Sequence, residues 1–528
     1  MIAVERIIAV LSPKWAASRS VNRLRSEVAG QRLAALSAFS AADKTRTNKD
    51  WGTKQYSADQ AIIPDGPTIR ARARAAKRDH WAARSIVDAY RRHVVGTGIT
   101  CRAKARDVRT GESLSRFNNQ ANTLFDAWAN NPRRCDIEGR KTFIEMQGLL
   151  IEEWATVGES FVILHYDVEH GLRFQVLEPE QLANRFDLRA QGDNQVRDGV
   201  EVNQYGRSIA YWFNNTWHPY DGFAIDPERV PAERVLHFFT QERAWQTRGV
   251  SRLAPVLVKL RHMQMYDEYQ IVRARLEACI GAAITRDPGM GDSAIPGLLG
   301  GSGDTEKDGN LNRQLNFEPG MVWELMQGEK LEFMQATAPG NFYEPFTKAQ
   351  LRQIAAGAGM DYPTVARDFT GGSFSSQREG HLERDKETDR LQRQLIDTVI
   401  RPIRDEFIRF EIASGRLVAP DFFNGEYEES AYLAANWAPP PKPWIDPSKQ
   451  AAAAKIALDY RLTTRQKELN ILGEDVLDTF GQLADEKAIA DGFGITLPDS
   501  AIDPKVIPQE PKPTSGFVEP EPKLEPVQ

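Results

Sequence analysis

The chain has 528 residues, of which 41% are hydrophobic and 27% are charged, a composition typical of a soluble globular protein with room for two to four domains. No apolar run approaches the roughly 18 residues of a transmembrane helix, and three widely separated cysteines argue against a disulfide framework and a zinc site. Residues 1–110 hold 22 Lys and Arg against nine Asp and Glu, a balance of +13, and the net charge of −6 leaves −19 for the remainder.

The N-terminal part is basic and partly helical. Its start, "MIAVERIIAVLSP", is not interpreted as a signal peptide, because Glu5 and Arg6 interrupt the apolar run and no small-residue cleavage site follows. One helix is predicted within 1–42, and polar, extended chain over 43–69. A second helix is predicted within "RDHWAARSIVDAYRRHVVGTGI" (78–99), whose apolar residues recur at helical spacing until two glycines end it. Such a basic region fits nucleic acid or an acidic neighbour, or equally a solvated arm.

The next segments mix helices with strands. Helical period is found in "FNNQANTLFDAWANN" and "KTFIEMQGLLIEEWATVG", whereas "ESFVILHYD" and "RFQVLEP" are predicted to be strands. The segment "VEVNQYGRSIAYWF" is predicted to be a hairpin that turns near 204–206. A long helix is predicted over 251–281, with Ser251 as its N-cap and Gly281 near its end.

A glycine-rich insertion follows this helix. Residues 286–310 are rich in Gly and Asp and are predicted to be a loop. A strand pair is predicted around Gly328 in "MVWELMQGEKLEFMQA", and a further helix in "EPFTKAQLRQIAAGAGM".

The last third is dominated by a second long helix. It follows the Gly/Ser loop "ARDFTGGSFSSQ", runs from about Ser376 to Ala413, and should kink at Pro402. Its apolar stripe consists of Leu391, Leu395, Val399, Ile403, Phe407 and Phe410. Two or three short helices are predicted within 448–494, and the proline-rich tail from 498 is predicted to be disordered.

The sequence contains no motif for catalysis or cofactor binding. A phosphate-binding G-x-x-x-x-G-K-[ST] and a G-x-S-x-G nucleophile motif are both absent. His381 and the pair His165 and His170 lack the three or four convergent ligands of a metal site and are predicted to face solvent. No catalytic residue, no metal ligand and no cofactor is therefore predicted, although a nuclease built on scattered carboxylates is left open.

The order of several segments resembles the lambda family of tailed-phage portal proteins, from about residue 50 to about residue 495. The most specific block is "VPAERVLHFFTQERAWQTRGVSRLAPVL" (230–257), in which the family has residues like His237, Gln246, Arg248, Gly249 and Ser251. The block "LRQIAAGAGMDYPTVARDFTGGSFSSQRE" (351–379) is nearly as specific. The segments "IRARARAAKRDHWAARSIVDAYRRHVVGTGI" and "CDIEGRKTFIEMQGLLIEEWATVGESFVIL" resemble the family's earlier elements.

The resemblance implies an α+β ring subunit with a mixed α/β wing, a long helical stem, a small α/β clip, a long kinked helix and a helical crown. The expected divisions are a basic N-terminal arm and helix (1–69), the wing (70–250), a stem helix (251–281), the clip (282–343), a second stem helix (344–366), a tunnel loop (367–376), the long helix returning to the wing (377–437), the crown (438–497) and the proline-rich tail (498–528).

It also implies functional residues. DNA-contacting residues of the tunnel loop would be Gly371, Gly372, Ser373, Ser375, Ser376 and Arg378, with Arg384 making further phosphate contacts. The stem helix would contact other helices of the same and adjacent subunits through Leu253, Leu257, Leu260, Met263 and Ile271, unless these residues belong to an ordinary intramolecular core. The basic arm, with Arg70, Arg72, Arg74, Lys77 and Arg78, would lie against a neighbouring subunit or the inner capsid face.

The function implied is a ring, a dodecamer in this family, that conducts double-stranded DNA without sequence preference during packaging and ejection. Its partners would be the terminase large subunit, head–tail connector proteins, and the major capsid or scaffold protein, with no membrane partner. The location would be the capsid portal vertex of the virion, and the host cytoplasm during assembly. The alternatives are a metal-dependent DNA-processing enzyme and a minor capsid scaffold that forms no ring.

Overall fold

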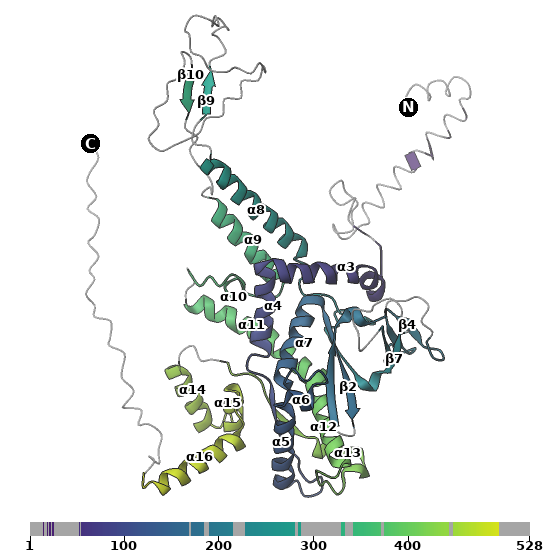
Figure 1. Cartoon of the computed structure of the whole chain (residues 1–528), viewed down its shortest axis with the longest axis vertical. Coiled ribbons are helices and arrows are strands. Elements are labelled where there is room, and N and C mark those ends of the chain that lie inside the picture. Colours follow the sequence, from purple (N-terminus) through teal and green to yellow (C-terminus); the bar gives the residue numbers. More distant parts are fainter. Residues whose placement is uncertain are drawn as a thin grey trace, which may run out of the picture. The chain divides into compact units, whose positions relative to one another are not determined.

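The computed structural model describes residues 54–167, 171–183, 190–214, 227–279, 283–286, 329–332, 342–370, 374–442 and 447–495, with residue 52 and a few helical positions between 14 and 25. The chain divides into two compact units, 1–61 and 62–528. The second unit contains helices and small antiparallel sheets (Figure 1), so the expectation of a mixed α and β fold is confirmed. None of the helices described is both long and apolar enough to cross a lipid bilayer.

Two helices form the beginning of the described chain. Helix α3 (Ala58–Asp79) begins well inside the segment predicted to be extended, and it contains Pro64 and Pro67. Ser57 and Gln60 account for its start, because each side chain accepts a hydrogen bond from the other residue's backbone N–H. Helix α4 (Trp81–Val94) follows after His80, whose ring Nδ1 accepts a hydrogen bond from the backbone N–H of Ala82.

The fold contains two antiparallel sheets that pack together through the strand β2 (Glu159–Asp167). Strand β2 lies between β3 (Gly171–Leu177) and β8 (Val235–Phe239), and a second sheet has the order β4 (Gln195–Arg197), β5 (Val200–Val202), β6 (Ser208–Phe213) and β7 (Glu228–Pro231). Val162 and Leu164 of β2 belong to the main core, whereas Phe161 and Ile163 pack with Tyr211 and Phe213 of the second sheet. Because both faces of β2 are buried, its central residues 161–164 are apolar without alternation. Both predicted strands and the hairpin near 204–206 are confirmed.

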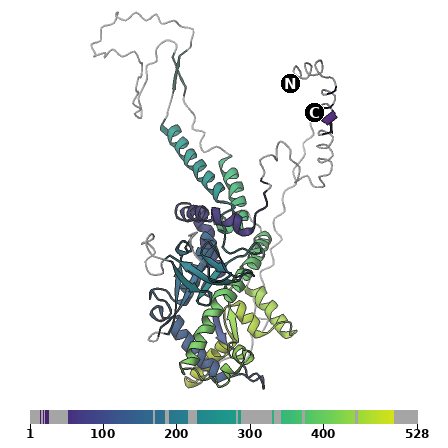
Figure 2. The same ribbon diagram turned by 90° about the vertical axis from the view of Figure 1, so that its right-hand side faces the viewer.

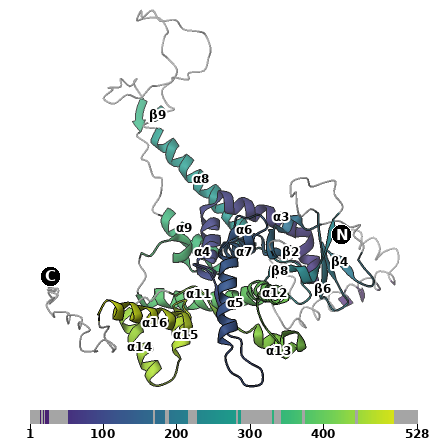
Figure 3. The same ribbon diagram turned by 60° about the horizontal axis from the view of Figure 1, so that its bottom comes forward.

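Helices cover the other face of the three-stranded sheet. Helix α7 (Phe143–Val157) starts with a capping box of Thr142 and Glu145 and packs against α4 and β2. Helices α5 (Ser115–Ala129) and α6 (Pro132–Cys135) precede it, and β1 (Thr100–Ala103) pairs with the distant β11 (Ala435–Ala438). Figure 3 shows α7 beside β2 from a further side.

The predicted stem helices are both shorter than expected. Helix α8 (Leu257–Cys279) begins only after a run of turns, and Ser251 caps those turns, since its hydroxyl accepts from the N–H of Leu253. The second predicted helix is divided into α9 (Tyr343–Gly357) and α10 (Tyr362–Ala366). Helices α8 and α9 lie side by side in Figures 1 and 2.

Between α8 and α9 the structure describes one two-stranded sheet. Strand β10 (Glu329–Glu332) pairs with β9 (Ala283–Arg286), a strand more than 40 residues earlier. The predicted loop 287–310 and the other half of the expected strand pair lie outside the described residues.

The second long helix is interrupted where proline was expected to disturb it. Helix α11 (Phe374–Leu395) continues through a π-helical turn (Ile396–Ile400) into α12 (Arg401–Ala413). Pro402 has no N–H to donate to the preceding turn, which accounts for the wider turn just before it. The predicted stripe is buried from Leu391 to Phe407, and Phe410 is half-buried.

Three short helices end the described chain: α14 (Pro447–Asp459), α15 (Arg465–Ile471) and α16 (Val476–Gly492). They follow α13 (Glu426–Tyr432) and lie together in Figure 3, which agrees with the two or three helices predicted there. The tail from 498, predicted to be disordered, lies outside the described residues.

Candidate functional site

The most elaborate polar cluster surrounds Glu159, the first residue of β2. The Glu159 carboxylate is completely buried and accepts hydrogen bonds from Arg248 Nη2 at 2.6 Å and from the backbone N–H of Gly249 at 2.9 Å. The ring Nε2 of His237 lies 3.1 Å from the same carboxylate. On the other side of Arg248, Nη1 donates to the Asp198 carboxylate and to its backbone carbonyl.

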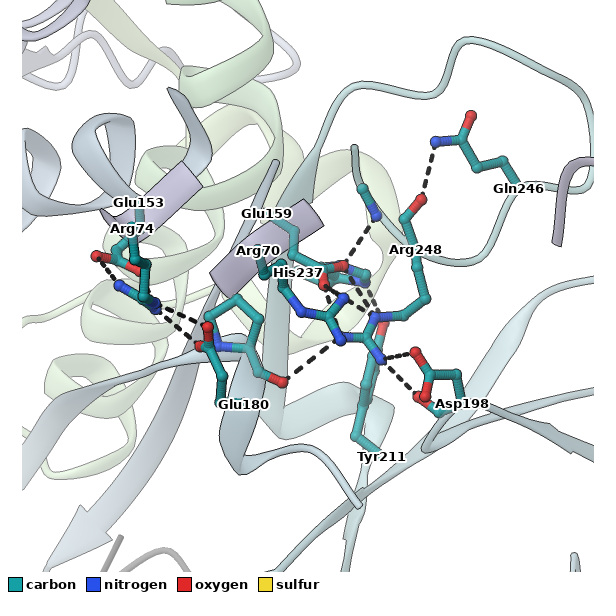
Figure 4. Close-up of polar contacts among 12 residues, drawn as sticks. Arg70, Arg74, Glu153, Glu159, Glu180, Asp198, Tyr211, His237, Gln246 and Arg248 are labelled. Atoms are coloured by element: carbon teal, nitrogen blue, oxygen red, sulfur yellow. Dashed lines mark hydrogen bonds and ion pairs between the residues drawn. The ribbon is translucent and has the colours of Figure 1, made fainter. Parts of the chain in front are cut away.

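A fifth residue ties the neighbouring helix to this cluster. Arg70 of α3 is 7% exposed, and its Nη1 lies 3.6 Å from Glu159 Oε1. The five residues Arg70, Glu159, Asp198, His237 and Arg248, here called the Glu159 network, therefore join α3, β2, β8, the turn between β4 and β5, and the segment that leads into α8 (Figure 4).

The charges of the network are matched. Burial alone would raise the pKa of Glu159, but the charge of Arg248 and hydrogen bonds from His237 and Arg248 hold this pKa well below its usual range. Burial lowers the pKa of His237 and leaves the imidazole neutral. Its Nε2–H then donates to Glu159, and its Nδ1 accepts from the Tyr211 hydroxyl at 3.5 Å.

The residues that sequence comparison singled out before α8 all act at this junction. The Gln246 side chain accepts from the backbone N–H groups of Glu242 and Arg243 and donates to the carbonyl of Arg248. Ser251 donates to the carbonyl of Thr156 at 2.6 Å. Because the carboxylate and the guanidinium are closed off from solvent, no substrate can reach them, and the network is structural.

Two glycines make the close approach possible. A Cβ on Gly249 would lie 2.1 Å from the carbonyl oxygen of Gly158, and a Cβ on Gly158 would lie 2.2 Å from the carbonyl carbon of Val250. Gly158 also has φ of +102°, a value that other residues rarely adopt. The end of α7 and the segment before α8 therefore touch backbone to backbone.

The predicted stem residues are divided between the core and the surface. Leu253, Leu260 and Met263 are buried in the main core of the chain itself, together with Leu351 and Ile354 of α9. These three residues therefore belong to an intramolecular core, which was the alternative to a subunit contact. Leu257 is partly buried and packs against the same core. Ile271 is 53% exposed, and the prediction of a subunit contact stays open for it.

The predicted basic arm is largely engaged within the chain. Arg74 forms ion pairs with Glu153 and Glu180, and Lys77 forms one with Glu152. Together with Arg70 of the Glu159 network, three of the five cations therefore have acidic partners inside the fold. The sequence could not indicate these ion pairs, because the glutamates lie 75 to 106 residues away from their cations. Arg72 and Arg78 are exposed, and Arg78 pairs with its neighbour Asp79.

The predicted tunnel loop is only partly described. Gly371, Gly372 and Ser373 lie outside the described residues, and the loop ends earlier than expected, because Ser375 and Ser376 are already in the first turn of α11. Arg378 is exposed on α11, whereas Arg384 is 3.8 Å from Asp361 and 3.6 Å from Asp385. Of the predicted DNA contacts, Arg378 is thus the charged side chain placed at the surface.

Arg378 lines an open groove beside the first half of α11, here called the α11 groove, with a volume of about 1050 Å³. The cations Arg92, Arg367, Arg378, Arg384 and Lys442 line it together with apolar residues that include Pro440, Pro441, Leu382, Ala453, Ala454 and Ala457. Asp385 and Glu468 are its acidic members. His93 also lines it, and burial, helped by Arg384 and Arg92, lowers the pKa of His93 to about 4.

The histidines considered as metal ligands do not converge. His165 is half-buried instead of facing solvent, and its Nε2 lies 2.8 Å from Gln175 Oε1. His381 lines the α11 groove, and His170 lies outside the described residues. Within the part of the chain that the structure describes, no group of three or more His, Cys, Asp or Glu is arranged to hold a metal ion.

Comparison with known families decides what kind of protein carries these features. A model of the family described as "Phage portal protein, lambda family" matches residues 44–392, more than half of the chain. The chain belongs to the lambda family of phage portal proteins. Its function is that of a phage portal protein, and this portal protein is a component of the virion.

Individual portal proteins agree with this assignment. A probable portal protein of Halomonas phage phiHAP-1 is 26% identical, with 87% of this chain and 88% of the relative covered. Portal protein B of Escherichia phage lambda is 23% identical over 85% of this chain and 89% of its own length. The portal protein of Escherichia phage N15 is also 23% identical.

Solved structures that resemble the chain come from gene transfer agent particles. The neck of an empty particle, computed with C6 symmetry, gives a TM-score of 0.36 at 13% identity and covers 76% of this chain and 93% of that chain. A native particle virion gives a TM-score of 0.35 at 12% identity, covering 78% and 93%. The family assignment rests on the sequence matches.

The residue that sequence reasoning missed in this portal protein is Glu159. The signal was present, because Glu159 is the one charged residue at the start of the apolar strand "ESFVIL". An unpaired charge there would be costly, so such a glutamate indicates a buried partner. Its partner Arg248 lies 89 residues later, and nothing in the sequence says which of the basic residues it is.

Proposed function

We propose that twelve copies of this chain close into a ring at one vertex of the capsid and that the ring is the conduit for double-stranded DNA during packaging and ejection. The family supplies the ring and the number of subunits. The structure contributes surfaces that a single subunit leaves uncovered.

The observation that carries the proposal is the amount of apolar surface on two groups of helices. On α8, Val258, Tyr269, Ile271 and Val272 are 49–65% exposed, although the helix makes its intramolecular contacts through other residues. Among the last three helices the exposed apolar side chains are Ile456, Tyr460, Leu462, Leu477, Phe480, Leu483 and Ile489. Several large apolar side chains exposed on the same group of helices favour contact with a partner. In a closed ring each subunit contacts its two neighbours through two different surfaces, which supplies that partner.

The proposed parts of the subunit follow from the family. Residues 70–250 would be the wing, α8 and α9 the stem, the segment 282–343 the clip, and residues 438–497 the crown. The Glu159 network would then join the wing to the base of the stem. Residues 367–376 would be the tunnel loop at the channel, where Gly371, Gly372, Ser373, Ser375, Ser376 and Arg378 would meet the DNA.

Weak, sequence-independent DNA contact suits a conduit. Each phosphate that is neutralised adds affinity and salt dependence, so a strongly basic channel would hold DNA instead of letting it slide. The balance of −19 beyond residue 110 favours a channel that repels the polyanion. The remaining basic residues would restrain DNA only where they reach the channel.

The partners would follow the stages of assembly. The terminase large subunit would bind the clip during packaging, head–tail connector proteins would replace it, and major capsid or scaffold protein would surround the wing. The subunit itself would have no catalytic activity. It would reside in the host cytoplasm during assembly and at the portal vertex afterwards.

Negative-stain microscopy and mass photometry of the purified full chain test the ring. We expect closed rings with a central hole and a mass of twelve subunits. Monomers or irregular aggregates in every buffer would overturn the ring and support the alternative of a minor capsid scaffold. Cleavage of plasmid DNA that depends on Mg²⁺ would instead support a DNA-processing enzyme.

A further inference from the structure

We propose that the α11 groove binds the acidic, proline-rich C-terminal tail of the same chain, residues 496–528. This goes beyond the portal function, and the binding does not depend on ring formation. The inference joins two features that the proposed function leaves unused: a groove with uncompensated cations, and a tail with the opposite charge.

The groove has cations available for a ligand. Arg92, Arg367 and Arg378 line it and are exposed, and none of them forms an ion pair within the described residues. Arg384 and Lys442 also line it, but they are partly neutralised by Asp361, Asp385 and Asp389. Three arginines that line one groove form a site for an anionic segment.

The groove also has an apolar part. Pro440 and Pro441 contribute ring surfaces, and Ala453, Ala454 and Ala457 give α14 a flat face of small side chains. Phe369, which is 61% exposed, and Leu382 complete it. An extended chain with regularly spaced prolines fits such a surface, because a polyproline II segment is already extended and loses little conformational entropy on docking.

The tail has the matching chemistry. Residues 496–528 contain eight prolines and six Asp or Glu against three Lys. Three of the acids, Glu519, Glu521 and Glu525, alternate with prolines in "FVEPEPKLEPV", which also supplies Phe517, Val518 and Leu524 for an apolar surface. Carboxylates that pair with the three arginines, and prolines and apolar residues that pack on the apolar part of the lining, match the composition of the groove.

The tail is long enough to reach the groove of its own subunit. Helix α16 ends at Gly492, and α15, which packs against it, contributes Glu468 and Ile471 to the groove. The 23 residues from 496 to 518 can span up to about 75 Å at roughly 3.3 Å per residue. The acidic segment 519–525 can therefore return to the α11 groove, whose lining includes residues of α14, two helices before α16.

DNA is a less suitable occupant of the same groove. A phosphate backbone would match the arginines, but the carboxylates of Asp385 and Glu468 would repel it. It would also leave the apolar lining residues without a partner. The groove adjoins residues 367–370, the start of the proposed tunnel loop. A docked tail would therefore neutralise the cations nearest to that loop.

Disulfide trapping in the full chain tests the proposal. In a variant carrying Ala454→Cys and Val518→Cys, we expect mild oxidation to form an intramolecular bond, identified by mass spectrometry of the linked peptides. The matched control carries Ser414→Cys, an exposed position at the end of α12 away from the groove, with the same Val518→Cys. Equal trapping at both positions would overturn the proposal.

Charge reversal separates docking from random collision. Replacing Glu519, Glu521 and Glu525 with Lys should lower the trapping yield roughly tenfold, since three exposed ion pairs are each worth up to about 1 kcal/mol. Adding Arg367→Glu and Arg378→Glu should restore much of the yield. Restoration would exclude misfolding as the cause, whereas no change in yield with charge would overturn the proposal.

Two further outcomes identify another occupant. A bond that forms only between two chains would show that the groove receives a neighbour's tail and would overturn docking in the same subunit. A short duplex DNA that abolishes trapping at physiological salt would show that DNA is the preferred ligand. We expect neither.

Discussion

At the scale of single residues, one buried carboxylate connects segments that are distant in sequence. Glu159 is fully buried, yet its two oxygens accept bonds from a guanidinium, a backbone amide and an imidazole. A buried ion pair of this kind contributes little net stability compared with apolar packing, but removing one partner leaves the other charged and unpaired. The expected effects of substitution follow from that asymmetry.

Replacing Glu159 with Gln should destabilise the subunit by about 3–5 kcal/mol, because Arg248 and Arg70 would stay buried without their counter-charge. Urea denaturation of the monomeric protein followed by circular dichroism measures the change. Glu426→Gln, at an exposed position in α13, is the matched control and should change stability by less than about 0.5 kcal/mol. Equal effects of the two substitutions would contradict a network centred on Glu159.

Acid should destabilise the protein through its buried histidines. The pKa of His93 is lowered to about 4, and that of His237 is also lowered, so both bind fewer protons in the folded than in the unfolded chain. Their contribution is therefore complete above an unfolded pKa of about 6.5 and is lost progressively as the pH falls from there towards the folded pKa. Glu159 adds to this only at lower pH, because its folded pKa is depressed below the usual range.

Thermal unfolding between pH 7 and pH 4.5 checks this expectation. His93→Gln should flatten the pH dependence, since the glutamine has no proton to bind. His262→Gln, at an exposed position of α8, is the matched control. A His93→Gln protein with the full pH dependence would show that His93 is not among the groups responsible.

At the scale of elements, local patterns predicted those structures whose causes are local. The apolar stripe and Pro402 correctly predicted a long helix and the position of its interruption. The start of α3 was missed because the polar, turn-rich composition of 43–69 indicates extended chain, although Ser57 and Gln60 had the spacing of a helix start. Helix α3 contains Pro64 and Pro67. The reciprocal hydrogen bonds of Ser57 and Gln60 determine where the helix starts.

Long-range pairings could not be predicted from the sequence. Strand β10 pairs with β9 across an insertion of more than 40 residues, and the partners of Arg74 and Lys77 come from α7 and the turn after β3. Such contacts depend on the whole fold, and no local propensity specifies them. Resemblance to a family, in contrast, predicted which residues before α8 matter without indicating what they bind.

The contact between Gly158 and Gly249 gives a sharp element-scale prediction. Either Gly158→Ala or Gly249→Ala should cost more than about 3 kcal/mol or prevent folding, because the added methyl group would overlap backbone atoms that cannot move aside. Gly380→Ala, in α11 with nothing within 4 Å of the new Cβ, should instead stabilise the subunit by up to about 1 kcal/mol. Soluble expression and the urea midpoint of the three variants measure this contrast.

At the scale of the whole molecule, α8 and the turns before it have two faces with different surroundings. Leu253, Leu260 and Met263 face the chain's own core, whereas Tyr269 and Val272 are exposed one helical turn apart. The first face determines whether the subunit folds, and the second, in the proposed ring, determines whether subunits associate.

Substitutions on the two faces should therefore have separable effects. Tyr269→Glu with Val272→Glu should abolish ring formation in mass photometry while changing the melting temperature of the monomer little. Leu260→Ala should lower the stability of the monomer by about 2–5 kcal/mol. Rings that form normally with two glutamates on α8 would exclude this face as the subunit contact.

The contact between the start of β2 and the segment before α8 constrains how portal genes can recombine. The two sides of the Glu159 network, one with Gly158 and the other with Gly249, are separated by about 90 residues of sequence. A crossover between them would join one parent's carboxylate and glycine to the other parent's guanidinium and amide. Such hybrids are viable only where both parents have the same contact at the junction, so exchanges that preserve folding should fall outside 158–249 or replace that interval as a block.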